Sequence, residues 1–478
     1  MTEQRGASTP LVSLLRGAAV TAPPTMPIGE ALALMESRRI GSLPIVDGDN
    51  RPLGVFTRQD VIGRIVLPQR PLSGPIADVM TTPVVSLPAG ATAGDATLTM
   101  AARGIRHVVV EGDTGQVVGV VSERDLFGMQ RLSVRELASD IRRARDLSTL
   151  RQCASDVRSL SYALVAQGVA SGQLTRMIAS LNDQVVQRVL ELVAPAHALE
   201  RLALCWLGMG SEGRSEQTIA TDQDNGLVFV AGEGVAPDAV RERLLPFASE
   251  VNHALDALGY PLCKGGVMAM NPRWCASLAE WEASFRSWID RGDPGALLDA
   301  QIFFDFRAIW GSASLAAELR RDVAARAEAN PRFLKQLADN ALRHRPPLNW
   351  FGELTSSPET EDGIDLKFFG TALVVDGARI LALASGVTTT NTVQRLDEAS
   401  GRGRLPPDEA RSLVDAFDFL NLQRLRTQHR RAAGLIAPSA NPNVVLLRDL
   451  SELDRRVLKE AMRQVRSLQQ RLELDYPG

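Results

Sequence analysis

Two carboxylates stand two residues apart in this sequence, Asp222 and Asp224, directly before the apolar run "NGLVFV" (225–230). Alternate residues of an extended segment point to the same side of the chain, so both carboxylates are expected to face one point in space. Paired carboxylate oxygens suit Mg²⁺, which fills its remaining positions with water and substrate phosphates. An isolated Asp-x-Asp pair is usually a solvated turn, so this prediction depends on the residues beside it.

A glycine-rich turn, "GSEGRSE", precedes the aspartates and follows the apolar run "LALCWL", which predicts a buried strand. Gly210, Ser211 and Gly213 can offer backbone N–H groups and a hydroxyl to a phosphate tail. Arg214 can add a charge-assisted contact to the same oxygens, and Glu216 is expected to fix the turn. The glycine turn, Arg214 and a catalytic, metal-binding carboxylate pair together predict a nucleotidyl-transfer site. At such a site a hydroxyl attacks the phosphate chain of a nucleoside triphosphate and pyrophosphate leaves.

The order G-S-x-G-R-x-E followed by D-x-D is complete in this chain and resembles the signature of the DNA-polymerase-β-like nucleotidyltransferase superfamily. Three longer stretches resemble the nucleotidyltransferases found fused to CBS-domain pairs: "GSEGRSEQTIATDQDNGLVF", "NPRWCASLAEWEASFRSWI" and "LLDAQIFFDFRAIWG". Those proteins are in turn similar to the catalytic region of bacterial protein-PII uridylyltransferase. The resemblance covers residues 140–475 and implies Mg²⁺-dependent transfer, of the two-metal type, from an NTP.

The third carboxylate of the superfamily has no clear counterpart here. Many members place it on a nearby strand, where it helps to hold the metal or takes the proton of the attacking hydroxyl. The corresponding stretch "GYPLCKGGVMAMNPRW" offers Lys264 and two glycines, which predict a second phosphate-side loop. Asp299 and Asp305 are the nearest candidates downstream for this role at the metal. Asp305 lies in an apolar stretch, and its alternative interpretation is a buried partner of Arg307.

An internal repeat occupies the first third of the chain. Residues 31–61 align without gaps on residues 96–126, so that Met35 pairs with Met100 and Thr57 with Ser122. Each copy predicts a helix, two strands around a polar turn and a hydroxyl at the N-cap of a new helix.

The repeat resembles the CBS domain, a module that works in tandem pairs, over residues 20–130. In that family the hydroxyl and a following aspartate bind the phosphate and the ribose of adenine nucleotides. The resemblance therefore implies sites for AMP or ATP, and a homodimer formed through the pair, with these ligand residues: Thr57, Asp60, Ser122 and Asp125. The alternative is that the hydroxyls are only caps and the aspartates only partners of the helix dipole.

The pattern predicts a multidomain protein of α/β and α class. Its expected parts are an N-terminal leader (1–20), the tandem CBS pair (21–130), a helical connector (131–198), a polymerase-β-like α/β nucleotidyltransferase core (199–322) and a helical C-terminal domain (323–478). In the resembling family the C-terminal bundle helps to hold substrate, and no catalytic residue is predicted in it.

Two C-terminal segments carry specific expectations. Residues 364–386 predict a core helix that is apolar except for three charged side chains, Lys367, Asp376 and Arg379. The basic run "LQRLRTQHRRAAG" (422–434) predicts a solvated helix face.

Composition narrows the classes of function. A net charge of −3 and a pI near 6.1 give no general attraction to nucleic acid or to anionic membranes. The four cysteines show neither Cys-x-x-Cys spacing nor a histidine cluster, which argues against disulfides and zinc. We expect no transmembrane helix and no signal peptide, and hence a cytoplasmic protein without a membrane partner.

Two hypotheses follow. In the first, the protein moves a nucleoside monophosphate from an NTP to the hydroxyl of an unknown protein or small molecule, and an adenine nucleotide at the CBS pair regulates it. In the second, the fold is kept without catalysis, and the protein is a CBS-type nucleotide sensor that acts through a partner.

Overall fold

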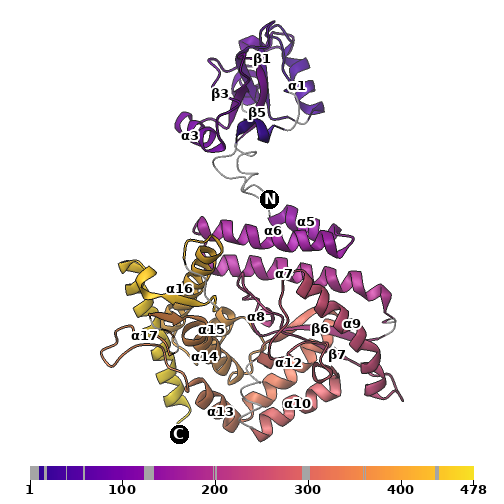
Figure 1. Ribbon diagram of the computed structural model, residues 1–478, viewed down its shortest axis with the longest axis vertical. Coiled ribbons are helices and arrows are strands. Elements are labelled where there is room, and N and C mark those ends of the chain that lie inside the picture. Colours follow the sequence, from indigo (N-terminus) through magenta and orange to yellow (C-terminus); the bar gives the residue numbers. More distant parts are fainter. Residues whose placement is uncertain are drawn as a thin grey trace. The chain divides into compact units, whose positions relative to one another are not determined.

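The computed structural model describes residues 10–15, 19–38, 40–57, 60–122, 134–197, 199, 202–292, 302–358, 360, 362–436 and 441–477. Two residues with a predicted role, Asp125 and Asp299, lie outside these ranges. The chain forms two compact units, Met1–Ser133 and Val134–Gly478 (Figure 1).

The first unit contains two copies of a helix–strand–strand pattern. Its elements are α1 (Ile28–Ser37), β1 (Ser42–Val46) and β2 (Pro52–Thr57), then β3 (Ser86–Pro88), α3 (Ala93–Arg103), β4 (His107–Glu111) and β5 (Val117–Ser122). In each copy the two long strands pair antiparallel, and β3 adds to β4 in parallel. Met35 and Met100 are buried at equivalent places against these strands. The tandem CBS fold predicted from the repeat is confirmed.

The two copies meet at the turn that follows β1. The Val117 N–H donates to the Asn50 carbonyl at 2.9 Å, and Asn50 Nδ2 donates to the Val117 carbonyl at 3.1 Å. Val46 and Val109 are buried in one apolar cluster with Val117. These contacts make the pair one compact unit.

The second unit begins with three helices, α5 (Val134–Arg143), α6 (Leu147–Ala166) and α7 (Ser171–Val193). Apolar residues recur along α7 at helical spacing, and they are buried on more than one side of it. Accordingly α7 contacts α5 and α6 on one side and α9 (Pro237–Ala257) and β9 (Phe306–Gly311) on another (Figure 1).

A four-stranded mixed sheet follows, in the order β8-β7-β6-β9. Its strands are β6 (Leu204–Met209), β7 (Asn225–Phe229), β8 (Cys275–Ser277) and β9. β6 runs antiparallel to both of its neighbours, whereas β7 and β8 are parallel. Every residue of β6 and β7 is buried, as the uninterrupted apolar runs predict for central strands. α10 (Leu278–Arg291) and α12 (Ala313–Glu328) pack beside the sheet.

The remaining part is a helical bundle with a small two-stranded ladder. It consists of α13 (Pro331–Ala341), α14 (Ala372–Leu383), α15 (Thr392–Gly401), α16 (Pro407–Ala432) and α17 (Glu452–Asp475), with β10 (Gly363–Asp365) paired to β11 (Val444–Leu446). Within this unit, α14 to α17 gather on one side and the sheet with α9, α10 and α12 on the other, with the short α8 (Gly210–Gly213) between them (Figure 1).

One hydrophobic core runs from the sheet into the bundle. Trp281 and Phe303 from the sheet side are buried in the same cluster as Phe333, Leu383 and Leu472 from α13, α14 and α17. A second cluster lies wholly within the bundle. The sheet and the bundle are therefore held together by a shared apolar core.

The structure corrects two C-terminal expectations. Residues 364–386 are not one helix, because the chain first forms β10 and a π-helical turn, Lys367–Thr371, and only then α14. The basic run of α16 is not a solvated face, because α16 lies against α6, α7, α15 and α17 and buries Gln423, Arg424, Thr427 and Gln428. Among the described helices, none combines the length and apolar content that crossing a membrane would require.

Candidate functional site

The glycine turn and the aspartates are joined at the ends of two paired strands. β6 ends at Met209, and Asp224 is the residue just before β7. The Met209 N–H donates to the Asp224 carbonyl at 2.8 Å. Gly210 has φ 56°, and a Cβ there would lie 3.0 Å from Asp224 Oδ2. A glycine is needed at this position because it permits both the left-handed backbone and the close approach of the carboxylate.

The two aspartates differ in environment. Asp222 is exposed, whereas Asp224 is half-buried. Burial raises the pKa of Asp224 to about 6, helped by the negative charge of Asp222 and opposed by a hydrogen bond with Cys263 and by the charges of Lys367 and Arg214. A bound cation would relieve this unfavourable burial of negative charge.

The donor set fits Mg²⁺. The described residues contain no cluster of three or more His, Cys, Asp or Glu side chains that could enclose a metal ion. Mg²⁺ does not need one, because it is usually bound by one or two carboxylates together with water and substrate phosphates. Asp222 and Asp224 are carboxylates of the kind that such a site uses.

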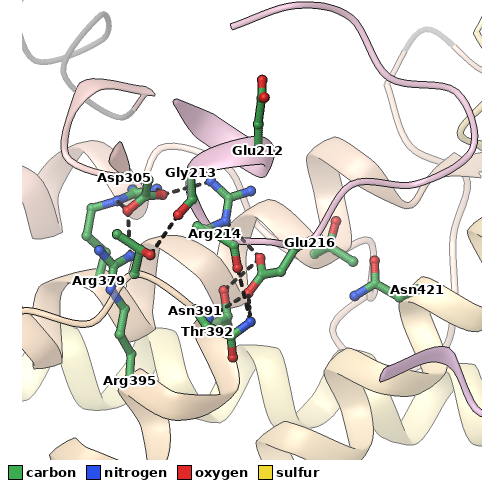
Figure 2. Close-up of polar contacts among 12 residues, drawn as sticks. Glu212, Gly213, Arg214, Glu216, Asp305, Arg379, Asn391, Thr392, Arg395 and Asn421 are labelled. Atoms are coloured by element: carbon green, nitrogen blue, oxygen red, sulfur yellow. Dashed lines mark hydrogen bonds and ion pairs between the residues drawn. The ribbon is translucent and has the colours of Figure 1, made fainter. Parts of the chain in front are cut away.

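Glu216 lies at the centre of a set of contacts between the glycine turn and the bundle. Its side chain is 8% exposed. One oxygen accepts from the Thr392 N–H at 2.5 Å and from Asn391 Nδ2 at 3.2 Å, and the other from Thr392 Oγ1 at 3.1 Å and Arg214 Nε at 2.8 Å. Figure 2 shows the bonds from Asn391 and Thr392, at the start of α15, meeting the Glu216 carboxylate. The signature glutamate thus binds a helix that lies more than 170 residues later in the chain.

Asp305 is surrounded by arginines. It is fully buried, and its two oxygens accept from Arg214 at 2.7 Å, from Arg379 at 2.6 and 3.1 Å and from Arg395 at 2.5 Å (Figure 2). Burial alone would raise the pKa of Asp305, but the charges of Arg379, Arg395 and Arg214 outweigh it and hold that pKa well below its usual range. With both oxygens engaged in this way, Asp305 is not placed to bind a metal.

Asp305 is buried and ion-paired, as its alternative interpretation predicts, but Arg307 as its partner is wrong. Arg307 Nη2 contacts Asp183 of α7 at 2.7 Å, and its Nε donates to the Glu212 carbonyl at 3.0 Å. Asp305 lies in a bend just before β9, whereas Arg307 lies within the strand, so the two side chains reach different partners.

Glu212 is a buried acid that sequence reasoning passed over. It occupies the variable position of the turn, is 5% exposed and points away from the Arg214 and Glu216 contacts in Figure 2. Burial raises the pKa of Glu212 to about 8, with further contributions from Asp183 and Asp224 against the charge of Arg307. Its position in a short turn between two buried strands is the signal that could have identified it.

The segment between the turn and the aspartates is held from two sides. Asn182 Nδ2 of α7 donates to Gln217 Oε1 at 3.2 Å, and the Tyr260 hydroxyl donates to Asn182 at 2.8 Å. From α16, Gln428 contacts Thr218 Oγ1 and the Ala220 N–H, each at 3.4 Å. Both helices were predicted from their patterns, but no single residue in them marked these contacts.

Lys264 lies in an exposed loop. The loop reaches the aspartates through its neighbour, because the Cys263 side chain hydrogen-bonds with Asp224. The loop therefore lies beside Asp224, and its role on the phosphate side stays a prediction.

In the first CBS copy, the two predicted ligand residues bind each other. The Thr57 N–H and hydroxyl both donate to Asp60 Oδ2, at 2.8 and 2.7 Å, while Thr81 Oγ1 and Arg64 reach Oδ1 at 3.2 and 3.3 Å. In the second copy, Ser122 ends β5 opposite His107. Asp60 would have to exchange some of these contacts to accept a ribose.

Comparison with protein families matches most of the chain. Residues 155–295 match "Putative nucleotidyltransferase DUF294", residues 331–476 match "Putative nucleotidyltransferase substrate binding domain", and residues 13–67 and 76–130 each match the CBS domain.

Curated relatives match a smaller part. "Uncharacterized protein MK0525" from Methanopyrus kandleri is 25% identical over 128 residues, which are 27% of this chain and 65% of that protein. An "Uncharacterized 17.7 kDa protein" from Acidianus ambivalens is 31% identical over 103 residues, 22% of this chain and 62% of that protein. The chain therefore spans less than two thirds of each of these relatives.

Two solved structures are similar to about a quarter of the chain. The CBS domain protein PAE2072 from Pyrobaculum aerophilum, complexed with AMP, is 30% identical, with 24% of this chain and 88% of that chain covered and a TM-score of 0.23. A conserved protein from Pyrococcus horikoshii is 26% identical, with 26% and 95% covered and a TM-score of 0.25.

Proposed function

Because this chain joins a CBS-domain pair to a nucleotidyltransferase domain of the DUF294 type and to its substrate-binding domain, we propose that it is an active Mg²⁺-dependent nucleotidyltransferase. It transfers a nucleoside monophosphate from an NTP to a hydroxyl of a protein or small-molecule acceptor. The observation that carries this proposal is the carboxylate pair beside a glycine turn, in which Asp224 is held with a raised pKa of about 6 next to Asp222.

The residues have distinct roles in this proposal. Asp222 and Asp224 hold Mg²⁺, which when bound offsets the charge of the phosphates and favours attack by a hydroxyl. Gly210, Ser211 and Gly213 line the turn where the phosphate tail binds. Arg214 was expected to contact phosphate directly. Its Nε and one Nη are engaged by Glu216 and Asp305, so it orients the turn and leaves one Nη for an anion.

Two finer features follow from the family resemblance. The transfer is of the uridylyl or adenylyl type with two metal ions, as in the uridylyltransferases that the chain resembles. An adenine nucleotide at the CBS pair, bound by the Thr57–Asp60 and Ser122–Asp125 pairs, regulates it, and the chain forms a homodimer through that pair. The support for the first nucleotide site is that Thr57 and Asp60 already meet at one point.

A second candidate function is a CBS-type sensor without catalysis. It is favoured by the position of Asp305, because this candidate for the third carboxylate is committed to three arginines. In that case the fold binds a nucleotide and acts through a partner.

The test compares two double variants of the full chain. Asp222→Asn with Asp224→Asn removes the proposed metal ligands, and Asp47→Asn with Asp49→Asn removes a pair of the same spacing in a turn of the first unit. Lysate is incubated with each labelled NTP and each protein. We expect labelling by wild type and by the control, and a loss of at least about 10²-fold in the first variant.

Equal labelling by wild type and by the Asp222–Asp224 variant would refute the metal site. Calorimetry with Mg²⁺ and each NTP separates the two candidate functions. Binding with transfer supports the enzyme, whereas binding without transfer to any component of the lysate supports the sensor.

A further inference from the structure

The glycine turn contains a residue in an unfavourable backbone conformation. Ser215, between Arg214 and Glu216, has φ 57°, a left-handed value that residues with a side chain rarely adopt. Such a conformation persists only where surrounding contacts determine it. The residues on both sides of Ser215 should therefore be held from outside the turn.

The start of α15 supplies those contacts. Thr390 Oγ1 donates to the Gly213 carbonyl at 2.7 Å, and Asn391 Nδ2 donates to the Arg214 carbonyl at 3.1 Å. Beyond Ser215, the Glu216 carboxylate accepts from the Thr392 N–H and hydroxyl. Three side chains in a row from the bundle thus hold the backbone before Ser215 and the side chain after it.

The geometry of the helix end explains why a carboxylate binds there. The first N–H groups of a helix have no partner within it, and negative charge is favoured at that end. Asn391 Oδ1 caps α15 by accepting from the Gln394 N–H, while its Nδ2 points to the turn. Glu216 accepts a hydrogen bond from the Thr392 N–H, which the Asn391 cap does not bind. Asn391 therefore binds both the helix and the turn.

The same helix also reaches the other side of Arg214. Arg395 of α15 and Arg379 of α14 bind Asp305, to which Arg214 also donates (Figure 2). Arg214 is consequently fixed at Nε through Glu216 and at one Nη through Asp305. Both fixed points depend on the bundle.

We infer that Asn391 and Thr392 are positioning residues of the transferase site, which act through Glu216 to hold the glycine turn in its phosphate-binding conformation. The inference rests on the proposed function for its consequence in catalysis. It gives the C-terminal domain a role in building the turn itself, in addition to holding substrate.

The first experiment uses the full chain and a matched pair at one position. Thr392→Val removes the hydroxyl and keeps the shape, whereas Thr392→Ser keeps the hydroxyl. We expect Thr392→Val to raise KM for the NTP about tenfold with a smaller change in kcat, and Thr392→Ser to stay within about twofold of wild type. Such a split, restored by serine, would not arise from a general loss of stability.

A second variant tests Asn391. Asn391→Asp keeps the oxygen that caps α15, but it removes the donor to Arg214 and places a second carboxylate beside Glu216. We expect a larger rise in KM than for Thr392→Val. Ser451→Ala, which removes the cap of α17 far along the chain, is the control and should leave KM unchanged.

Hydrogen exchange of the peptide that spans residues 208–220 measures the turn without any nucleotide. We expect faster exchange there in Thr392→Val and Asn391→Asp, and wild-type exchange in Thr392→Ser and Ser451→Ala. Wild-type exchange in Thr392→Val and Asn391→Asp would overturn the inference, as would an unchanged KM in both.

The two proposals fail in different ways. If wild type neither binds Mg²⁺-NTP nor transfers a nucleotide, the proposed function is refuted, while faster exchange of the turn in Thr392→Val would still support its positioning by α15. If wild type is active and the turn exchanges normally in every variant, only the positioning role is refuted.

Discussion

The CBS unit and the transferase turn both bring a hydroxyl and a carboxylate together, but from very different distances along the chain. In the first CBS copy, Thr57 and Asp60 are three residues apart and bind each other. In the transferase turn, Glu216 binds Thr392 and Arg214 binds Asp305, partners 176 and 91 residues away. A local pair can form in one unit alone, whereas the turn depends on the sheet and the bundle being in place.

The largest effect on these long-range contacts is expected when Asp305, the acid that three arginines bind, is replaced. Asp305→Asn leaves Arg214, Arg379 and Arg395 buried with one fewer negative charge. We expect the second unit to lose about 3–5 kcal/mol of free energy of unfolding. All six tryptophans of the chain lie between residues 206 and 350, so urea unfolding followed by tryptophan fluorescence reports this unit.

The control for that prediction is Asp322→Asn, which removes a half-exposed partner of Arg326 on α12. Its effect should stay below about 1 kcal/mol. Equal effects of the two variants would show that the arginine cluster is no more important than a surface ion pair.

The next largest effect is expected from Glu212, whose burial should make the second unit less stable at high pH. Because burial raises its pKa from 4.5 to about 8, the folded state binds a proton that the unfolded state releases between those values. Stability of the second unit should therefore fall as the pH rises from about 4.5 to 8, in the absence of divalent metal. Glu212→Gln removes this contribution and should be more stable than wild type at pH 9, by roughly a few kcal/mol.

Tryptophan-monitored unfolding at pH 5, 7 and 9, in the presence of a chelator, measures this dependence. Parallel curves of wild type and Glu212→Gln across that range would show that Glu212 is ionised without cost in the folded protein.

A smaller effect is expected in the pH dependence of metal binding. Since the pKa of Asp224 is about 6, protonation should weaken Mg²⁺-NTP binding about tenfold for each pH unit below 6. Burial is the main cause of the raised pKa and the charge of Asp222 the second. Asp222→Asn should therefore weaken binding at pH 8 and also move the midpoint of the pH profile to lower pH.

Calorimetric titrations of Mg²⁺ with each NTP between pH 5 and 8 test this prediction. A midpoint that stays in place in Asp222→Asn would mean that the two aspartates do not interact.

The smallest effect is expected in the local pair. Thr57→Ala removes one hydroxyl bond to Asp60 and leaves the Thr57 N–H bond in place. We expect a loss of about 1 kcal/mol, confined to the first unit. That unit has neither tryptophan nor tyrosine, so scanning calorimetry of the full chain is the suitable measurement, and the tryptophan-monitored transition should not move.

The sequence was sufficient where the information is local or periodic. The repeat, the buried strands before and after the turn and the Asp222–Asp224 spacing depend on neighbours along the chain, and the structure contains the CBS copies and strands as predicted. The partners that Glu216 has in the bundle could not be predicted, because Asn391 and Thr392 look like ordinary residues at the start of a surface helix. Only the folded chain shows that this helix end faces the turn.

Asp305 shows how the same limit produced an error. The pairing of Asp305 with Arg307 was predicted from their closeness in sequence. Closeness in sequence does not determine which donors surround a buried acid in the folded chain. Burial instead selects for several donors at once, and three arginines from the turn, α14 and α15 satisfy it.

The apolar core shared by the sheet and the bundle has a consequence for how such proteins can be recombined. Trp281 and Phe303 on one side belong to the same cluster as Leu383 and Leu472 on the other, so a cut between residues 292 and 331 would expose apolar surface on both fragments, with the tryptophans on the first. The transferase region and the C-terminal bundle therefore cannot be exchanged independently. In a hybrid with the bundle of another protein, that bundle would have to supply side chains that fit the transferase side of the core. No described residue of the CBS pair belongs to this core, so a cut near residue 133 would leave the core whole.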